Sequence, residues 1–265
     1  MKLLIAHILC LFSVLGLSTQ PTAGRPVRVV SSKEDVRVFV DGKEVGMTPY
    51  LSVLTCDSHW FYGIHDGLHS AVERIRLKDG PGDVPVIELV FHDYVDLGLP
   101  SGTLWATCNV GAKVPEDFGD YYAWGETSPV NEHTSDNYTF QTKYTRKIDP
   151  AVIHWGADWC LPTVEQFREL IDKHFTVCTW TELNGVGGYR IKSLKNDNSI
   201  FLPAAGFSHD EKMQDVGSVG SYWSQSTGSV YLNGAYQLFF YVEDTDVNLC
   251  DRFYGRNIRP VVGKN

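Results

Sequence analysis

Alternation at a period of two residues, broken by tight-turn signals, is the feature that most constrains the first third of the chain. Val36, Val38 and Val40 have the spacing of one face of a β-strand, and Asp41-Gly42 follow them directly. Asp-Gly between two such runs favours a tight hairpin, because both turn positions need a positive φ. No stretch between residues 25 and 92 has a helical period, so we expect a small all-β sandwich there. Further strands are predicted over residues 59–65, 72–77 and 84–91.

Residues 1–24 have the composition of an export signal. Lys2 is followed by a short apolar run, residues 3–17, and then by small residues. The run is shorter than the roughly 20 residues of a membrane helix, and no later segment is apolar for long enough. Cys10 leaves a lipoprotein signal as an alternative, although the bulky Leu9 precedes it. We therefore expect an exported protein without a transmembrane span in its mature chain.

The net charge limits the classes of partner that the chain can bind, and the cysteine count limits its disulfides. The net charge is −9 and no basic run occurs, so a nucleic-acid partner is excluded, because phosphate binding needs clustered Lys and Arg. Five cysteines follow the expected signal, and an odd number leaves at least one unpaired or paired between chains. A disulfide from Cys108 to either Cys160 or Cys178 is the pairing we expect within the larger part of the chain, and the connectivity stays open.

Residues 93–265 are rich in Trp, Tyr and Gly and contain one clear helix signal. Thr163 is followed three residues later by Gln166, which is the pattern of a capping box. Strands are predicted over 189–193, after a turn at 185–188, and over 199–203. One helix among short strands and long connections predicts an α+β domain. The helical stripe is formed by Val164, Phe167, Leu170, Ile171 and Phe175.

Residues 38–50 read Val-Phe-Val-Asp-Gly-Lys-Glu-Val-Gly-Met-Thr-Pro-Tyr, and this segment resembles the signature of the PEGA family. The resemblance covers residues 36–91. It departs from the family at Cys56-Asp57-Ser58, where a glycine-rich turn is usual. Because PEGA modules are small extracytoplasmic β domains, the resemblance implies a spacer or interaction module without known catalysis at residues 25–92.

Residues 95–112 read Val-Asp-Leu-Gly-Leu-Pro-Ser-Gly-Thr-Leu-Trp-Ala-Thr-Cys-Asn-Val-Gly-Ala, and they begin a series of blocks that resembles the Fibrobacter succinogenes major paralogous domain family. The resemblance implies a C-type-lectin-like fold, of the subclass shared with formylglycine-generating enzymes, at residues 93–265. It also implies an exported bacterial protein, at the outer surface or in the periplasm. The later blocks are 119–127, 161–163, 178–180, 201–206, 222–224 and 259–261.

The resemblance to the Fibrobacter succinogenes major paralogous domain family has a further implication for the C-terminal segment. Some members of the family are targets of diversity-generating retroelements, which vary a ligand-binding surface. Their variable cassette ends in a pattern similar to residues 252–261 here, with Ile258 in place of Val. The Trp residues inside the family-like blocks are expected to be mostly core. They are Trp105, Trp124, Trp159, Trp180 and Trp223.

Residues 237–242 alternate between two faces of a predicted strand. Leu238, Phe240 and Val242 have the spacing of a core face. Large aromatic residues on the opposite face are typical of a contact surface. We therefore predict recognition of a protein or glycan ligand at the cell exterior. The predicted contact residues are Gln237, Phe239, Tyr241, Asn248, Asp251, Phe253, Tyr254 and Arg256.

Catalysis and metal binding have weaker support in the sequence. Cys250 has no neighbouring cysteine for oxidative chemistry, and Asp120 with Glu126 is expected to hold loops. We therefore predict no enzyme activity and no cofactor. An envelope-associated enzyme and a structural pilus or matrix component remain the alternative functions. Calcium is a secondary alternative, because carboxylates gather near the C-terminus without a calcium-loop pattern. They belong to Glu243, Asp244, Asp246 and Asp251, beside Asn248.

Overall fold

The structure is a computed structural model that describes residues 24–139 and 143–263. It is mostly β, with 45% strand and 7% helix, and contains several small, largely antiparallel sheets and two short α-helices. The structure is therefore mostly β, with less helix than the expected α+β class implies. Residues 1–23 of the expected export signal lie outside the described residues. Within the described part, no helix is long and apolar enough to span a membrane.

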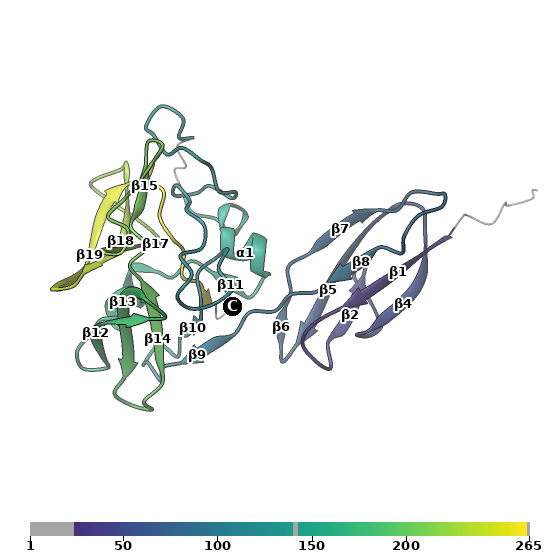
Figure 1. Cartoon of the computed structure of the whole chain (residues 1–265), viewed down its shortest axis with the longest axis horizontal. Coiled ribbons are helices and arrows are strands. Elements are labelled where there is room, and N and C mark those ends of the chain that lie inside the picture. The colour runs from purple at the N-terminus through teal and green to yellow at the C-terminus, as the bar shows by residue number, and fades with distance from the viewer. Residues whose placement is uncertain (1–23, 140–142, 264–265) are drawn as a thin grey trace, which may run out of the picture.

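The N-terminal part consists of two sheets that enclose one hydrophobic core (Figure 1). In the three-stranded sheet, β1 (Gly24–Val30) pairs with β4 (Tyr50–Thr55) and, in parallel, with β8 (Val86–Glu88). The alternating valines of β1 and β2 point inward from the two sheets, which confirms an all-β structure for residues 25–92. The second sheet consists of β2 (Arg37–Val40), β3 (Lys43–Met47), β5 (Ser58–His65), β6 (Leu68–His69) and β7 (Glu73–Arg76).

The predicted hairpin at Asp41-Gly42 is confirmed. These two residues join β2 to β3 with φ values of 49° and 80°, the left-handed values that the turn requires. The Asp41 carboxylate also accepts a hydrogen bond from the backbone N–H of Trp60 at 3.0 Å. The turn is thereby attached to the neighbouring strand β5, which pairs with β2.

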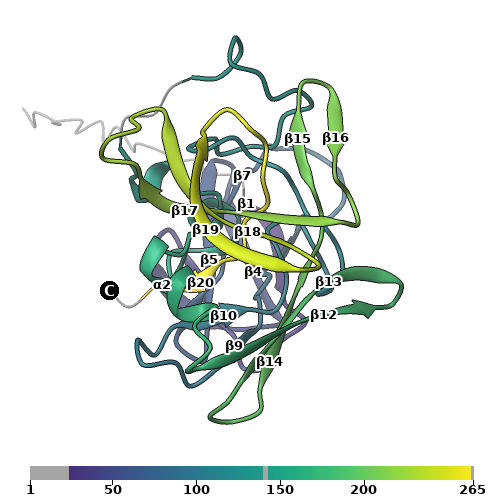
Figure 2. The ribbon, with the colours of Figure 1, turned by 90° about the vertical axis from the view of Figure 1, so that its left-hand side faces the viewer.

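The C-terminal part is built from four sheets, which Figure 2 shows from the side of β19. The first, in the order β11-β20-β10-β9, brings together β9 (Tyr94–Asp96), β10 (Leu104–Ala106), β11 (Trp159–Cys160) and β20 (Val261–Val262). The second contains β12 (Thr176–Leu183), β13 (Val186–Ser193) and β14 (Ser199–Pro203). The others are the hairpin of β15 (Phe207–His209) and β16 (Lys212–Gln214) and the sheet of β17 (Val219–Thr227), β18 (Gly234–Tyr241) and β19 (Asp244–Asp251).

Two helices lie between these strands. The predicted capping box is confirmed in α2 (Val164–Leu170), where Thr163 and Gln166 each accept a backbone N–H of the other. The helix ends at Leu170, so Phe175 packs against the core from a turn instead. The sequence prediction missed α1 (Pro150–Trp155), although Asp149 caps it and Pro150 occupies its first turn.

Two sequence predictions for the C-terminal part are wrong. The turn before β13 is formed by Asn184 and Gly185, both with positive φ, and β13 already begins at Val186. All five cysteines among the described residues are free thiols, so Cys108 forms no disulfide with Cys160 or Cys178. The tryptophan prediction is confirmed for Trp105, Trp124, Trp159 and Trp223, which are almost fully buried, whereas Trp180 is partly buried against the hydrophobic cluster that contains Trp105.

The two parts meet beside α1 and β11 (Figure 1). Asp158 Oδ2 accepts a hydrogen bond from the His69 backbone N–H at 2.6 Å. The same carboxylate oxygen lies 2.9 Å from Nδ1 of the His69 ring. The His92 ring stacks on Trp155 with centroids 3.6 Å apart. Burial lowers the pKa of His92 to about 4. A neutral imidazole therefore forms part of this junction at neutral pH.

Candidate functional site

The sheet of β17, β18 and β19 has one face in the core. Tyr222, Leu238 and Phe240 are fully buried there, which confirms the prediction for the latter two. The Phe240 ring occupies the space where a side chain at Gly220 would lie, so β17 needs glycine at that position. Val242 does not continue the stripe. It follows the end of β18 and is exposed, so its predicted core position is wrong.

A row of hydrogen bonds crosses the opposite face of this sheet. Ser221 Oγ donates to Gln237 Oε1 at 2.7 Å, and Gln237 Nε2 donates to Asn248 Oδ1 at 2.9 Å. Asn248 in turn donates to Asp246 Oδ2 at 3.2 Å. Gln237 is only 5% exposed. Its predicted place on an outward contact face is therefore wrong: it joins three strands from inside, while Asn248 is partly exposed beside it.

Arg256 is also an interior residue, with 3% of its surface exposed. Its guanidinium carbon lies 5.1 to 5.3 Å from the ring centroids of Trp223, Phe207 and Tyr254. Its two Nη atoms donate to Ser221 Oγ and Cys250 Sγ. Burial lowers the pKa of Arg256. The prediction that Arg256 faces a ligand is wrong, and the side chain instead supports the rings around it.

Four partly exposed rings gather above Arg256, and we call them the aromatic cluster: Phe207, His209, Phe253 and Tyr254. Phe253 and Tyr254 stack with centroids 4.6 Å apart, and the His209 ring lies 4.8 Å from that of Tyr254. Phe207 meets Tyr254 edge-on at 5.7 Å. The cluster joins the hairpin of β15 and β16 to the segment after β19, two regions far apart in the sequence.

Backbone hydrogen bonds fix the two segments that carry the aromatic cluster. The N–H of Ser208 donates to the carbonyl of Gly255 at 2.8 Å, and the reverse bond measures 2.9 Å. A Cβ at Gly255 would lie 2.4 Å from the His133 ring, so glycine leaves the space that this ring occupies. The rings are therefore attached to a paired backbone and have a defined position.

An apolar loop adjoins the aromatic cluster and was missed by the sequence prediction. Val230, Tyr231 and Leu232 are 94%, 43% and 67% exposed between β17 and β18. The Tyr231 hydroxyl donates to Asp251, and the backbone N–H of Arg252 donates to the carbonyl of Asn233 at 3.2 Å. The signal was present in the sequence as three apolar residues inside a turn segment, where polar residues are usual.

The remaining predicted contact residues lie at two ends of one strand pair. Asp251 pairs with Gly234 at the end nearest the aromatic cluster, and it accepts the Tyr231 hydroxyl. Phe239 and Tyr241 lie toward the other end, where their cross-strand partners are Asp246 and Asp244. Their rings meet edge-on with centroids 6.4 Å apart, and Tyr241 is exposed. The eight predicted residues therefore do not form one patch.

The calcium alternative finds no support in the geometry. Within residues 24–139 and 143–263, no group of three or more His, Cys, Asp or Glu side chains could hold a metal ion. The acidic residues are spread along β19, because Asp244 and Asp251 occupy opposite ends of that strand. Asp120 and Glu126 hold loops as expected, since they accept hydrogen bonds from the Tyr122 hydroxyl and the Ala123 backbone.

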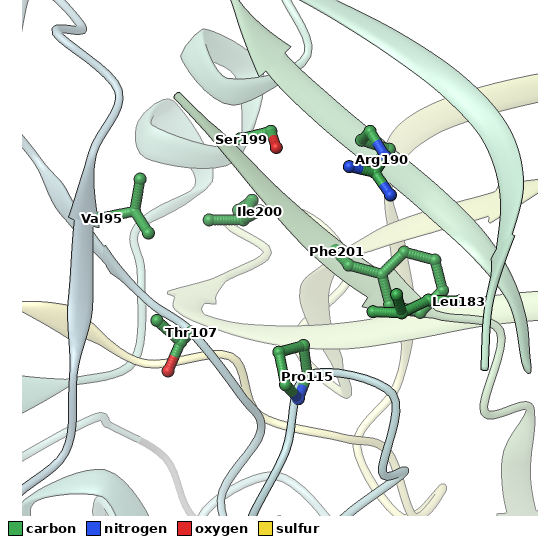
Figure 3. A pocket seen from close by; sticks show the side chains of 8 residues that line it. All are labelled: Val95, Thr107, Pro115, Leu183, Arg190, Ser199, Ile200 and Phe201. Atoms are coloured by element: carbon green, nitrogen blue, oxygen red, sulfur yellow. The ribbon is translucent and has the colours of Figure 1, made fainter. Parts of the chain in front are cut away.

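Open hollows occur away from the aromatic cluster. One of 330 Å³ lies at the junction of the two parts, where His92, His154 and Trp155 contribute to its wall. Another of 180 Å³ lies beside β14 and is lined mainly by apolar side chains, with Arg190 at its edge (Figure 3).

Comparison of the chain with models of protein families, with curated proteins and with solved structures gave no match.

Proposed function

We propose that this chain is an exported, surface-associated bacterial protein that binds a macromolecular ligand through the aromatic cluster and the loop Val230–Leu232. In this proposal the C-terminal part is a C-type-lectin-like domain, and the N-terminal part is a PEGA-like sandwich that serves as a spacer. The sequence motifs support both assignments. The arrangement of two sheets around one core at residues 24–91 is compatible with the second.

The observation that carries the proposal is the gathering of partly exposed rings beside an exposed apolar loop. Phe253 and Tyr254 stack on each other, and Val230 and Leu232 are mostly exposed in the loop whose Tyr231 hydroxyl donates to Asp251. Large apolar side chains left exposed together are typical of interaction sites, and aromatic residues supply much of the binding energy at interfaces.

The rings are preorganised for binding. Arg256 packs beneath Phe207 and Tyr254, and the paired backbone of Ser208 and Gly255 fixes both segments. A ligand would therefore immobilise few additional side chains, which lowers the entropic cost of association. Gln237 and Arg256 act as internal supports in this proposal, whereas Asp251, Phe253 and Tyr254 contact the ligand.

A protein ligand fits the surface better than a glycan. One face of the Phe253 ring and one face of the Tyr254 ring are turned toward each other, which leaves less ring surface for stacking on a sugar. Val230 and Leu232 carry no hydrogen-bonding side-chain group, and their apolar area is best covered by apolar side chains of a partner.

The test is a binding screen with paired variants. The full chain is applied to immobilised extracellular proteins and to a glycan array, and then compared with the double variant Phe253→Ala/Tyr254→Ala. Loss of two central rings should weaken binding at least about 10-fold. The matched control is Phe39→Ala/Tyr62→Ala, because that pair stacks at 4.7 Å on the N-terminal part. Equal binding by wild type and the first variant would refute the proposal.

Diversification of the segment is a separate part of the proposal with its own test. The exposed positions Phe253 and Tyr254 lie directly before the buried stretch 255–261. A near-copy of the codons for residues 222–261, beside a reverse-transcriptase gene and differing at adenines, is the expected genomic arrangement. Its absence would leave a binding protein with a fixed surface.

A further inference from the structure

We propose that the 180 Å³ hollow beside β14 binds a small amphipathic monoanion, a carboxylate carried on one aromatic ring or a short acyl chain. The hollow lies between β9, β14 and the end of β12, away from β17, β18 and β19. The proposal therefore does not depend on ligand binding by the aromatic cluster. Its lining residues are Val95, Thr107, Pro115, Leu183, Arg190, Ser199, Ile200 and Phe201.

The hollow has apolar walls and a charged edge. Figure 3 shows the Arg190 guanidinium at one edge, with Val95 across the space and Pro115 below it. Ile200 and Phe201, which are almost fully buried, are among its apolar lining residues. Pockets for small ligands combine such apolar lining with a few polar groups that fix the orientation of the ligand.

The size of the hollow restricts the ligand to a small one. An apolar cavity of about 150 Å³ accommodates benzene, so a single ring fits a space of this order. The 180 Å³ available here therefore suits one ring or a short chain. The hollow is partly open to solvent, which leaves the charged group of such a ligand free to reach Arg190.

Arg190 is available for a ligand because its neighbours have other partners. Lys192, on the same face of β13, pairs with Asp197 at 2.8 Å. Glu116, beside the lining residue Pro115, accepts a hydrogen bond from Asn184 Nδ2 at 2.5 Å. Among the described residues, the Arg190 side chain has no hydrogen bond or ion pair, although its backbone pairs with β12 and β14. The guanidinium is exposed and unpaired, so it is open to an anion.

The chemistry of the edge favours a carboxylate over a phosphate. A guanidinium binds a carboxylate with two parallel N–H···O bonds, and its single positive charge balances one negative charge. The Ser199 hydroxyl lines the same hollow and adds a neutral hydrogen-bond donor, whereas the Thr107 hydroxyl donates to the Asp93 carbonyl at 3.3 Å. A dianionic phosphate would leave a charge unbalanced against apolar walls, and that costs free energy.

The test compares acids with their neutral amides on the full chain. Benzoate and hexanoate are titrated by ligand-observed NMR beside benzamide and hexanamide. Benzoate, hexanoate or both should bind with a Kd of about 1 mM, the range expected for so few ligand atoms. The matching amide should bind at least about 10-fold more weakly, because it lacks the charge that Arg190 balances.

Variants distinguish binding in the hollow from unspecific binding to the surface of the protein. Arg190→Met keeps the aliphatic stem and should weaken acid binding at least about 10-fold, whereas Lys192→Met on the same face should leave it unchanged. Ser199→Leu fills part of the hollow and should weaken the acid and the amide alike. Failure of both acids to bind, equal binding of acid and amide, or unchanged binding by Arg190→Met would each overturn the proposal.

Discussion

At the scale of single residues, Arg256 shows how a sequence pattern can suggest the wrong role. Arginine is common at binding hot spots, and Arg256 follows two aromatic residues that are partly exposed. The rings that enclose it belong to Phe207, Trp223 and Tyr254, so two of them come from distant segments. Neighbouring residues in the sequence carry no information about that enclosure, which arises only when β15 and β17 pack together.

Arg256 yields the first stability prediction. Arg256→Ala should lower the free energy of unfolding by about 3 kcal/mol, because it leaves a cavity between three rings. Arg256→Met should lower it by less than about 1.5 kcal/mol, since it fills much of the space and removes a desolvated charge. Urea denaturation followed by tryptophan fluorescence measures both. Equal losses for Met and Ala would show that the charge and its hydrogen bonds, rather than packing, stabilise the site.

At the scale of elements, local signals were predictable and long-range ones were not. The hairpin at Asp41-Gly42 and the cap at Thr163 depend on residues a few positions apart, and both are confirmed. The core stripe of β18 was found at Leu238 and Phe240, but the period-two pattern could not show where the strand ends, so Val242 was misplaced. The loop Val230–Leu232 was missed because it breaks the usual polarity of turns.

The cap of α2 yields a prediction for this short helix. Thr163→Ala removes the side-chain oxygen that accepts the Gln166 N–H at 3.1 Å. The expected loss is about 1 kcal/mol of unfolding free energy, the usual cost of an N-cap. Urea titration is the measurement, and Thr163→Ser is the control, because serine keeps the accepting oxygen. Equal losses in the two variants would mean that the threonine methyl group, rather than the cap, matters.

At the scale of the whole molecule, the junction between the two parts includes a histidine that resists protonation. His92 stacks on Trp155 and meets Trp159 edge-on at 6.4 Å. Sequence reasoning placed a boundary at residues 92–93 but could not predict this contact, because α1 and β11 supply the tryptophans from about 60 residues further along the chain.

The pKa of His92 gives the junction a pH dependence. The folded pKa of about 4 lies below the unfolded value near 6.5. As the pH falls, the imidazole is therefore protonated in the unfolded chain before it is protonated in the folded chain. Stability falls as the pH drops from about 6.5 toward about 4, by about 2 kcal/mol after allowance for partial exposure. His92→Phe keeps a stacked ring and should show a flatter dependence in urea titrations at pH 7.5 and pH 5.

A second histidine supplies the control for that measurement. His174 is largely exposed, so His174→Phe should leave the pH dependence of the wild-type chain in place. Comparison of the two variants isolates the contribution of His92 to the pH dependence of stability, because the remaining histidines are the same in both. A His92→Phe protein as sensitive to acid as the His174→Phe protein would show that the junction histidine is not responsible.

The place of β20 has a consequence for biosynthesis. Val261–Val262 lies between β10 and β11 in a sheet whose other members are made about 100 to 170 residues earlier. Until the ribosome has released this segment, the facing edges of β10 and β11 have no partner, and unpaired edges are prone to wrong association. A nascent chain must therefore be synthesised past residue 262 before this sheet closes, and a chaperone that shields strand edges would raise its yield.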